Sequence, residues 1–169
     1  MKQAILIFSK TNKIIESARK KYDPLYREFK SHITVAFPFE NVSQKKLEKH
    51  ITNAIKGIKP FELVLKGVRK SPKEFYLYLL VNKGKKELIK IHKKLYSKLL
   101  TKHLRKDIPY IPHVTIGIFH EKKYIDKALK ELRNKKVESK TKVNSISLIT
   151  LNKKYKNESI KEVKKFYLN

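Results

Sequence analysis

The sequence predicts an α+β fold in which two pseudo-symmetric lobes, each an antiparallel-rich sheet with helices on its outer face, surround a central groove. Three observations support this prediction. Segments with the two-residue period of strands alternate with segments of helical period. The order of these elements restarts about halfway along the 169 residues. Two pentapeptides, Ser-His-Ile-Thr-Val at 31–35 and Pro-His-Val-Thr-Ile at 112–116, occupy the same place in the two runs of elements.

The first half of the chain reads as five elements in the order strand, helix, strand, helix, strand. Their expected bounds are 4–8, 11–21, 32–37, 43–55 and 61–68. Thr11 and Ser43 precede the two helical runs, and their hydroxyls are suited to cap a helix N-terminus. Pro24 ends the first helix and Pro38 closes the second strand, because proline has no backbone N–H to donate. Residues 22–30 are therefore expected to form a loop.

The second half repeats this order and adds a final strand. The expected bounds are 75–81, 85–102, 113–119, 123–133, 142–151 and 160–168. An offset of 81 residues, fixed by His32 and His113, superimposes the two motif strands, the helices that follow them and the strands after those helices. An internal duplication is the economical explanation. We therefore expect a single domain over residues 1–169, with duplicated lobes at about 1–70 and 71–169 and the terminal strand completing the sheets.

Composition limits the chemistry and indicates a polyanionic partner. The chain has no cysteine, which excludes disulfides, thiolate nucleophiles and cysteine-ligated zinc. Its net charge of +27 favours attraction to RNA or a nucleotide. Because 37 of the 42 basic residues are lysines, an AT-rich genome is an alternative source of part of this charge. The apolar run 4–8 is too short for a signal peptide or a membrane span, so we expect a cytoplasmic protein without a membrane partner.

The two His-x-Thr motifs carry the functional prediction. Side chains at positions i and i+2 of a strand point the same way, so His32 shares a face with Thr34, and His113 shares a face with Thr115. In a duplicated fold, two imidazoles and two hydroxyls meet across the groove. One histidine can accept a proton from a nucleophile while the other donates one to a leaving oxygen, and the hydroxyls can bind the phosphate. This chemistry requires neither a metal nor a cofactor.

These motifs resemble those of the 2H phosphoesterase superfamily, which includes the 2′-5′ RNA ligase-like proteins and cyclic phosphodiesterases. His32-Ile33-Thr34-Val35 and His113-Val114-Thr115-Ile116 match its two H-x-T/S-x motifs, and the likeness extends over essentially the whole chain. The stretch Tyr22-Asp23-Pro24 is similar to a subgroup of small bacterial proteins provisionally named phosphoesterases.

The resemblance implies a metal-independent enzyme that opens 2′,3′-cyclic phosphates, or cleaves 2′-5′ linkages, at RNA ends. Carried onto this chain, it implies one histidine as acid and the other as base, with His32 cast as the acid and His113 as the base by analogy with the family; the sequence itself leaves that order open. Thr34 and Thr115 would hold the phosphate. We expect a monomer whose partner is an RNA or nucleotide with such an end. Whether hydrolysis or ligation is the physiological direction, and which substrate is used, stays open at this point.

Two other functions are compatible with the sequence. One is a phosphodiesterase of a small nucleotide, such as ADP-ribose cyclic phosphate or 2′-5′ oligoadenylate. The other is an RNA-binding module without catalysis. The intact motifs argue against the binding module, and the excess of positive charge weakly favours RNA ends over small nucleotides.

Other residues near the motifs or rich in charge receive no catalytic role. Four histidines lack a paired setting and are expected at the surface, which argues against a zinc site: His50, His92, His103 and His120. Five residues lie near the motifs in sequence and are left unassigned: Tyr22, Tyr26, Lys30, Tyr110 and His120. The lysine-rich segments 83–102 and 122–142 are either RNA-contacting surfaces or solvated helix faces.

Overall fold

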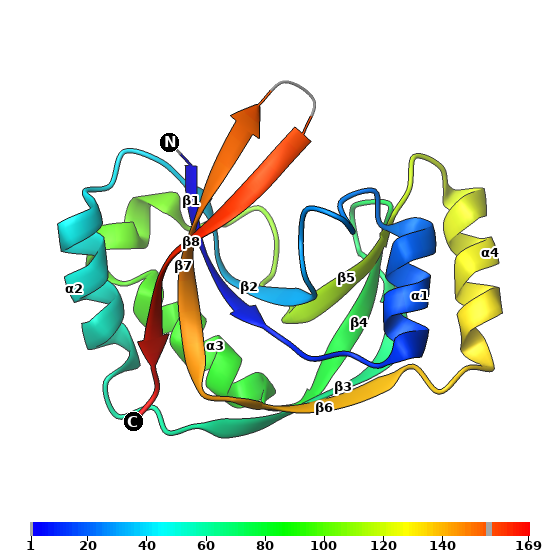
Figure 1. The fold of residues 1–169 in the computed structure, drawn as a ribbon, viewed down its shortest axis with the longest axis horizontal. Coiled ribbons are helices and arrows are strands. Elements are labelled where there is room, and N and C mark those ends of the chain that lie inside the picture. Colours follow the sequence, from blue (N-terminus) through cyan, green and yellow to red (C-terminus); the bar gives the residue numbers. More distant parts are fainter. Residues whose placement is uncertain (1, 155–156) are drawn as a thin grey trace.

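Residues 2–154 and 157–169 are described in the computed structural model, where strands and helices alternate as the sequence predicts (Figure 1). The strands are β1 (Lys2–Phe8), β2 (His32–Phe39), β3 (Phe61–Lys70), β4 (Tyr76–Lys83), β5 (His113–Ile118), β6 (Glu138–Val143), β7 (Ser145–Lys154) and β8 (Asn157–Tyr167). The helices are α1 (Lys13–Tyr22), α2 (Gln44–Ile55), α3 (Lys85–Leu95) and α4 (Lys122–Arg133), with a short 3₁₀ helix at Lys98–His103. These elements confirm the α+β class.

The described strands form an antiparallel sheet in the order β6-β3-β4-β5-β2-β1-β7-β8. At its centre, β2 and β5 are joined through the pairing of Ile33 with Val114. We call β6-β3-β4-β5 the first arm of the sheet and β2-β1-β7-β8 the second arm. Helix α1 packs against β5 and α4 against β3 and β4, whereas α3 packs against β2 and α2 against α3. Figure 1 shows α1 and α4 together on one side of the molecule and α2 and α3 on the other.

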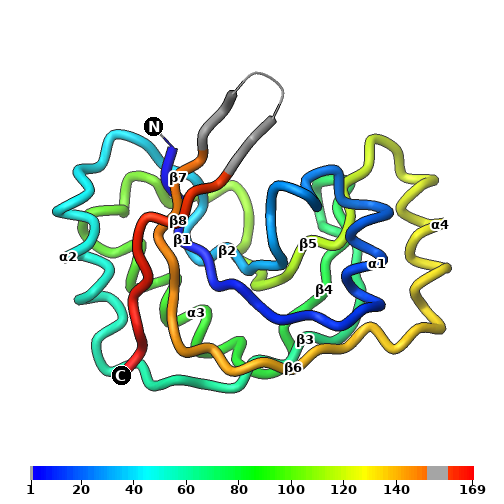
Figure 2. The backbone as a smooth tube through the Cα atoms, in the orientation of Figure 1, coloured from blue at the N-terminus to red at the C-terminus, as the bar shows by residue number. Residues whose placement is uncertain are grey.

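The two arms do not coincide with the expected lobes 1–70 and 71–169. Strand β3 of the first half lies beside β4 in the first arm, and β7 of the second half lies beside β1 in the second arm. The five residues 71–75 connect β3 to β4, and so short a connection favours antiparallel neighbours. Figure 2 shows the backbone crossing from α2 to β3 along the lower edge of the view and returning from α4 through β6 to β7 along the same edge. Each arm therefore combines strands from both halves of the sequence.

The long helix expected at 85–102 is wrong in its C-terminal part. Helix α3 ends at Leu95, and the 3₁₀ helix begins after a break. Lys98 has a φ of 53°, a left-handed conformation that is incompatible with a continuing α-helix. The apolar period continues through this break because Leu99 and Leu100 still pack on the core, so periodicity alone could not reveal it.

Two other boundaries differ from the prediction. Asn12, rather than Thr11, caps α1, and its side-chain oxygen accepts a hydrogen bond of 3.0 Å from the Ile15 amide. The strand expected at 142–151 belongs to two strands, β6 and β7, separated at Asn144. The chain passes from the first arm to the second at this residue.

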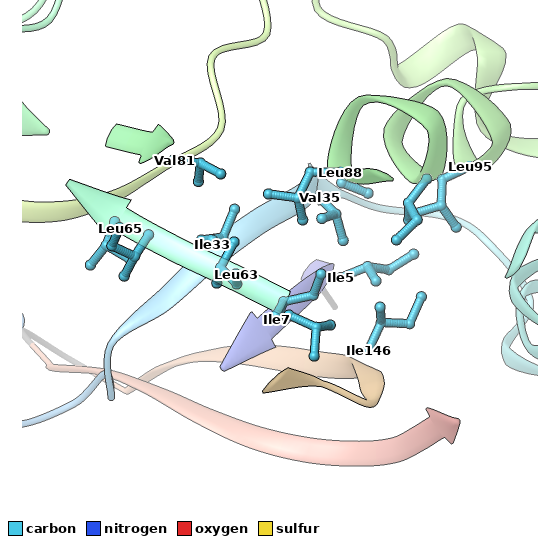
Figure 3. Packing of buried hydrophobic residues seen from close by; sticks show 14 of the residues in the cluster. Ile5, Ile7, Ile33, Val35, Leu63, Leu65, Val81, Leu88, Leu95 and Ile146 are labelled. Atoms are coloured by element: carbon cyan, nitrogen blue, oxygen red, sulfur yellow. The ribbon is translucent and has the colours of Figure 1, made fainter. Parts of the chain in front are cut away.

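An apolar cluster extends through both arms and beneath the helices (Figure 3). Ile5, Ile33, Leu63, Leu88 and Ile146 come from five different elements and are all completely buried. Removing such side chains from water is the main force that holds the arms and helices together. The strands that carry the two motifs therefore rest on a shared core. No helix in the described part of the chain is long and apolar enough to cross a membrane.

Candidate active site

The two motifs lie at the starts of β2 and β5, the strands that join the arms. In an antiparallel pair, the pairing of Ile33 with Val114 places each motif histidine opposite the threonine of the other motif. Side chains alternate along a strand, so the two histidines and two threonines share one face, and Ile33 and Val114 share the opposite, buried face. The structure therefore brings together the four predicted site residues, all of them half-buried: His32, Thr34, His113 and Thr115.

The two histidine rings are oriented in the same way. His32 Nδ1 lies 2.8 Å from the Lys30 carbonyl oxygen, and His113 Nδ1 lies 2.6 Å from the Ile111 carbonyl oxygen. A carbonyl oxygen can only accept a hydrogen bond, so Nδ1 carries the hydrogen in both rings. The Nε2 atom of each neutral ring consequently has a free lone pair. This is the nitrogen that can exchange a proton with a ligand.

Burial makes both histidines weaker bases than usual. Together with a smaller effect of the neighbouring His32 charge, and against the opposing effect of the Ile111 carbonyl, it lowers the pKa of His113 to about 4. Burial also lowers the pKa of His32, with a contribution in the same direction from the positive charge of Arg19. Both rings are therefore neutral at pH 7 in the free protein.

Aromatic side chains hold the two rings from different sides. The His113 ring stacks on Tyr78 of β4, with centroids 3.4 Å apart and planes inclined by 18°. The His32 ring lies 5.6 Å from Phe29 and makes an edge contact with Phe8 at 6.4 Å. These contacts limit rotation of the rings and remove water from their faces, which is the physical origin of the lowered pKa values.

A cavity of about 260 Å³ borders the second motif. It is lined by Thr34, His113 and Thr115 but not by His32. Six further lining residues supply aromatic surface and positive charge: Phe37, Lys73, Tyr76, Tyr78, Arg105 and Tyr110. If a phosphate binds next to the motif residues, the rest of the cavity offers aromatic surface, with basic groups at its edge, to the group attached to that phosphate.

The basic side chains at this edge are fixed to the loop before β5. Arg105 makes two hydrogen bonds to the Asp107 carboxylate, at 2.6 and 3.2 Å. Lys73 donates to the Asp107 backbone carbonyl at 2.5 Å. The Lys73 bond connects the loop before β4 to the loop before β5, at the part of the cavity that Lys73 and Arg105 line.

Tyr110 and His92 contact the backbone of the first motif through hydrogen bonds. The Tyr110 hydroxyl donates to the Thr34 carbonyl oxygen at 3.0 Å, and His92 Nδ1 lies 2.9 Å from the Val35 carbonyl oxygen. Their rings stack, with centroids 3.7 Å apart and planes inclined by 4°. The prediction of a surface position is therefore wrong for His92, which is 6% exposed. Its spacing with Leu88 and Leu95 on the apolar face of α3 was a usable signal of burial.

The remaining histidines lie outside the paired motifs. His120 is exposed, as predicted, whereas His50 is half-buried and its Nε2 lies 2.7 Å from the Leu95 carbonyl oxygen. His103 is half-buried beside Phe39. Over residues 2–154 and 157–169, no three His, Asp or Glu side chains are grouped so that they could hold a metal ion.

Comparison with curated proteins finds relatives that share about a third of the aligned residues. A Bacillus licheniformis protein, named provisionally as a phosphoesterase, is 32% identical over 123 residues, covering 69% of this chain and 70% of that protein. The RNA 2′,3′-cyclic phosphodiesterase of Methanocaldococcus jannaschii is 32% identical over 106 residues, covering 62% of this chain and 60% of that protein.

Comparison with solved structures finds the same arrangement of strands and helices in LigT of E. coli. The LigT complex with 3′-AMP matches with a TM-score of 0.63 at 15% identity, over 99% of this chain and 97% of LigT. A family model described as the 2′-5′ RNA ligase superfamily matches residues 8–154, a range that includes both motifs. The chain belongs to the 2′-5′ RNA ligase superfamily.

Proposed function

We propose that this protein is a metal-independent phosphoesterase that acts on 2′,3′-cyclic phosphates or 2′-5′ phosphodiester linkages at RNA ends. The observation that carries the proposal is the meeting of the two His-Thr pairs on one face of the sheet, where the Ile33–Val114 pairing aligns them. Family membership and the name of the Methanocaldococcus jannaschii relative support the same class of reaction.

In the proposed hydrolysis, Nε2 of His113 accepts a proton from a water molecule as its oxygen attacks the phosphorus. The bond between phosphorus and the 3′ oxygen breaks, and Nε2 of His32 donates a proton to that oxygen. The product is a 2′-phosphate with a free 3′ hydroxyl. Both roles need the nitrogen that the Nδ1 bonds to Lys30 and Ile111 leave free.

The protonation states fit this division of roles once an anion is bound. A base must begin neutral, and the pKa of His113, lowered to about 4, ensures this at pH 7. An acid must begin protonated, whereas burial favours neutral His32 in the free protein. A bound phosphate stabilises an adjacent imidazolium and raises its pKa. We therefore propose that substrate binding charges His32, whereas His113, whose pKa starts at about 4, stays neutral in the complex.

Thr34 and Thr115 are proposed to hold the phosphate. Each lies across the β2–β5 pairing from a histidine, so a group between the rings is within reach of both strands. A threonine hydroxyl can donate one hydrogen bond to a non-bridging oxygen and so stabilise the charge that grows there during attack. The nearby cavity, with Phe37 and Tyr76 in its wall, offers apolar surface to the attached nucleoside.

The decisive experiment is a turnover assay in excess EDTA with the purified full chain. Its substrates are a nucleoside 2′,3′-cyclic phosphate, an oligoribonucleotide with a cyclic-phosphate end, a 2′-5′-linked dinucleotide and ADP-ribose cyclic phosphate. We expect turnover of a cyclic-phosphate or 2′-5′ RNA substrate, and the folded protein's failure on all of them would refute the proposal. Preferential turnover of ADP-ribose cyclic phosphate would instead identify a small-nucleotide enzyme.

Substitution of the histidines tests the assigned roles in the same assay. His32→Ala and His113→Ala are each expected to lower kcat by about 10²- to 10⁴-fold, because each removes a proton-transfer group. His120→Ala is the matched control, since His120 is exposed and outside the site. Comparable activity of a folded His32→Ala or His113→Ala variant and the control would eliminate that histidine from catalysis.

A further inference from the structure

A surface hollow lies beside the first motif, on a different part of the surface from the aromatic cavity. Its lining includes Ser9, Lys10, Arg19, Arg27 and Lys30, and we call it the Lys10–Arg27 hollow. Four basic side chains and one carboxylate contribute to it. The charges in this hollow therefore favour an anion.

The hollow adjoins His32 along both strands that meet there. Ser9 directly follows Phe8, which pairs with His32 between β1 and β2, and the Ser9 amide donates to the Ser31 carbonyl oxygen at 3.0 Å. The Lys30 carbonyl is the group that orients the His32 ring. The aromatic cavity is lined by His113, whereas this hollow is built from the immediate neighbours of His32.

Two buried polar atoms distinguish this hollow from the rest of a basic surface. Arg19 is 2% exposed, and its terminal nitrogens donate to Asp23 at 2.9 Å, to the Phe29 carbonyl at 2.7 Å and to Ser31 at 3.2 Å. Within the described residues, however, Arg19 Nε and Ser9 Oγ are buried without a hydrogen-bond partner. Buried polar atoms are normally paired, and both of these unpaired atoms belong to side chains that line the hollow.

Basic charge alone would not single out this place. The hollow between β3 and α4 is lined by Lys66, Arg133, Lys135 and Lys136, yet none of its lining side chains contains a buried unpaired polar atom within the described chain. The carboxylate of the Lys10–Arg27 hollow, Glu16, is itself occupied, because it accepts hydrogen bonds from Thr11 and Ser31. Glu16 keeps its negative charge but lies 3.7 Å from Arg19 Nη1, and the three exposed cations Lys10, Arg27 and Lys30 outnumber it, so the net charge of the lining is positive.

We propose that the Lys10–Arg27 hollow is an anion subsite that binds the phosphodiester next to the reacting phosphate of an RNA chain. Lys10 and Lys30 supply mobile positive charges, and the Arg27 guanidinium can bind phosphate oxygens in a bidentate manner. The inference rests on the proposed function of the two motifs. It specifies the substrate further, as the end of an oligonucleotide rather than a mononucleotide.

The test compares three proteins and three substrates. The variant is Lys10→Gln with Arg27→Gln, which removes two exposed charges and leaves the Lys30 carbonyl intact. The control is Lys45→Gln with Lys49→Gln, which removes two exposed charges from α2 on the other side of the molecule. The substrates are a nucleoside 2′,3′-cyclic phosphate, a trinucleotide ending in the same group, and that trinucleotide with an uncharged methylphosphonate at the adjacent linkage.

We expect the wild-type protein to prefer the charged trinucleotide. The Lys10/Arg27 variant should lose about tenfold in kcat/KM for this substrate, because charge-assisted bonds to the adjacent phosphate disappear. Its kcat/KM for the mononucleotide should change less than about twofold by the same argument. The control should retain the preference. The methylphosphonate should lower the wild-type value to that of the variant, without a further effect on the variant.

Equal trinucleotide preference in the variant and the control would overturn the subsite, as would a wild-type rate that does not respond to the methylphosphonate. Absence of turnover on every substrate would instead refute the proposed function. In that case the existence of the subsite is tested by binding. The affinity of each protein for a labelled trinucleotide with a 3′-phosphate is measured by fluorescence anisotropy. Equal affinities of the Lys10/Arg27 variant and the control would refute it, and selective weakening of the variant would support it.

Discussion

Ile33 of β2 and Val114 of β5 pair at the centre of the sheet and connect its two arms. Each directly follows a motif histidine, so the separation of the two imidazoles depends on how these strands meet. Ile33 is 0% exposed and Val114 is 1% exposed, and both belong to the apolar cluster that extends through both arms. Core packing and the geometry of the candidate site thus depend on the same contact.

Ile33→Ala is expected to lower the free energy of unfolding by about 2–4 kcal/mol, because it leaves a cavity beneath the site. Urea denaturation measures this change. Ile14→Ala is the matched control, since Ile14 is 37% exposed and should contribute less than about 0.5 kcal/mol. Equal destabilisation by the two substitutions would show that the junction is not a packing centre.

Tyr110→Phe tests the support behind the first motif. The substitution keeps the stack on His92 but removes the hydroxyl that donates to the Thr34 carbonyl oxygen. We expect a loss of about 1–2 kcal/mol in stability and a several-fold lower kcat, because the carbonyl loses its partner and Thr34 is less well held. Guanidinium denaturation and the cyclic-phosphate assay measure the two effects.

Tyr96→Phe provides the comparison for this experiment. The Tyr96 hydroxyl accepts a hydrogen bond of 2.8 Å from the Phe37 amide, so its removal also leaves a backbone group unpaired. This bond lies farther along β2 than Thr34. A similar loss of stability with a smaller loss of kcat would support a specific role of Tyr110. Equal losses of kcat would show that Tyr110 stabilises strand β2 in general and does not specifically position Thr34.

The catalytic candidates were accessible to prediction because strand periodicity is local. Alternation places His32 and Thr34 on one face whatever the rest of the chain does, and the second copy of the motif indicated where a partner would lie. The contributions of Tyr110 and Arg19 were not accessible. Tyr110 contacts Thr34 across 76 residues, and such a contact leaves no pattern in a single sequence.

The fold was predictable to a similar extent. The hydrophobic periodicity of each segment indicated the order of strands and helices along the chain. It did not indicate that β3 pairs with β4 in the first arm, or that β7 pairs with β1 in the second. Which strands pair depends on packing among distant segments and on short connections such as 71–75. The break at Lys98 was hidden for a related reason, because tertiary packing keeps the next leucines on the core.

His113 should make the folded protein sensitive to acid. Its pKa is about 4 in the folded state and near 6.5 in an unfolded chain, so the unfolded state binds more protons between these values. The stabilising effect of neutral His113 is therefore complete above about pH 6.5 and is lost as the pH falls towards 4, by about 2–3 kcal/mol. Chemical denaturation at a series of pH values should show a shallower decline for His113→Gln than for the wild type. Parallel curves would contradict the lowered pKa.

The pH dependence of turnover tests the proposed acid and base together. The profile of kcat/KM reports the free enzyme, in which His113 is an available base above about pH 4 and His32 is a competent acid only below its own lowered pKa. We therefore expect kcat/KM to be highest under acidic conditions and to begin its fall at a pH below the 6.5 of an ordinary histidine. The profile of kcat reports the complex, in which the bound phosphate raises the pKa of His32. Its alkaline limb should consequently lie at higher pH than that of kcat/KM, and coincident limbs would show that the substrate does not charge His32.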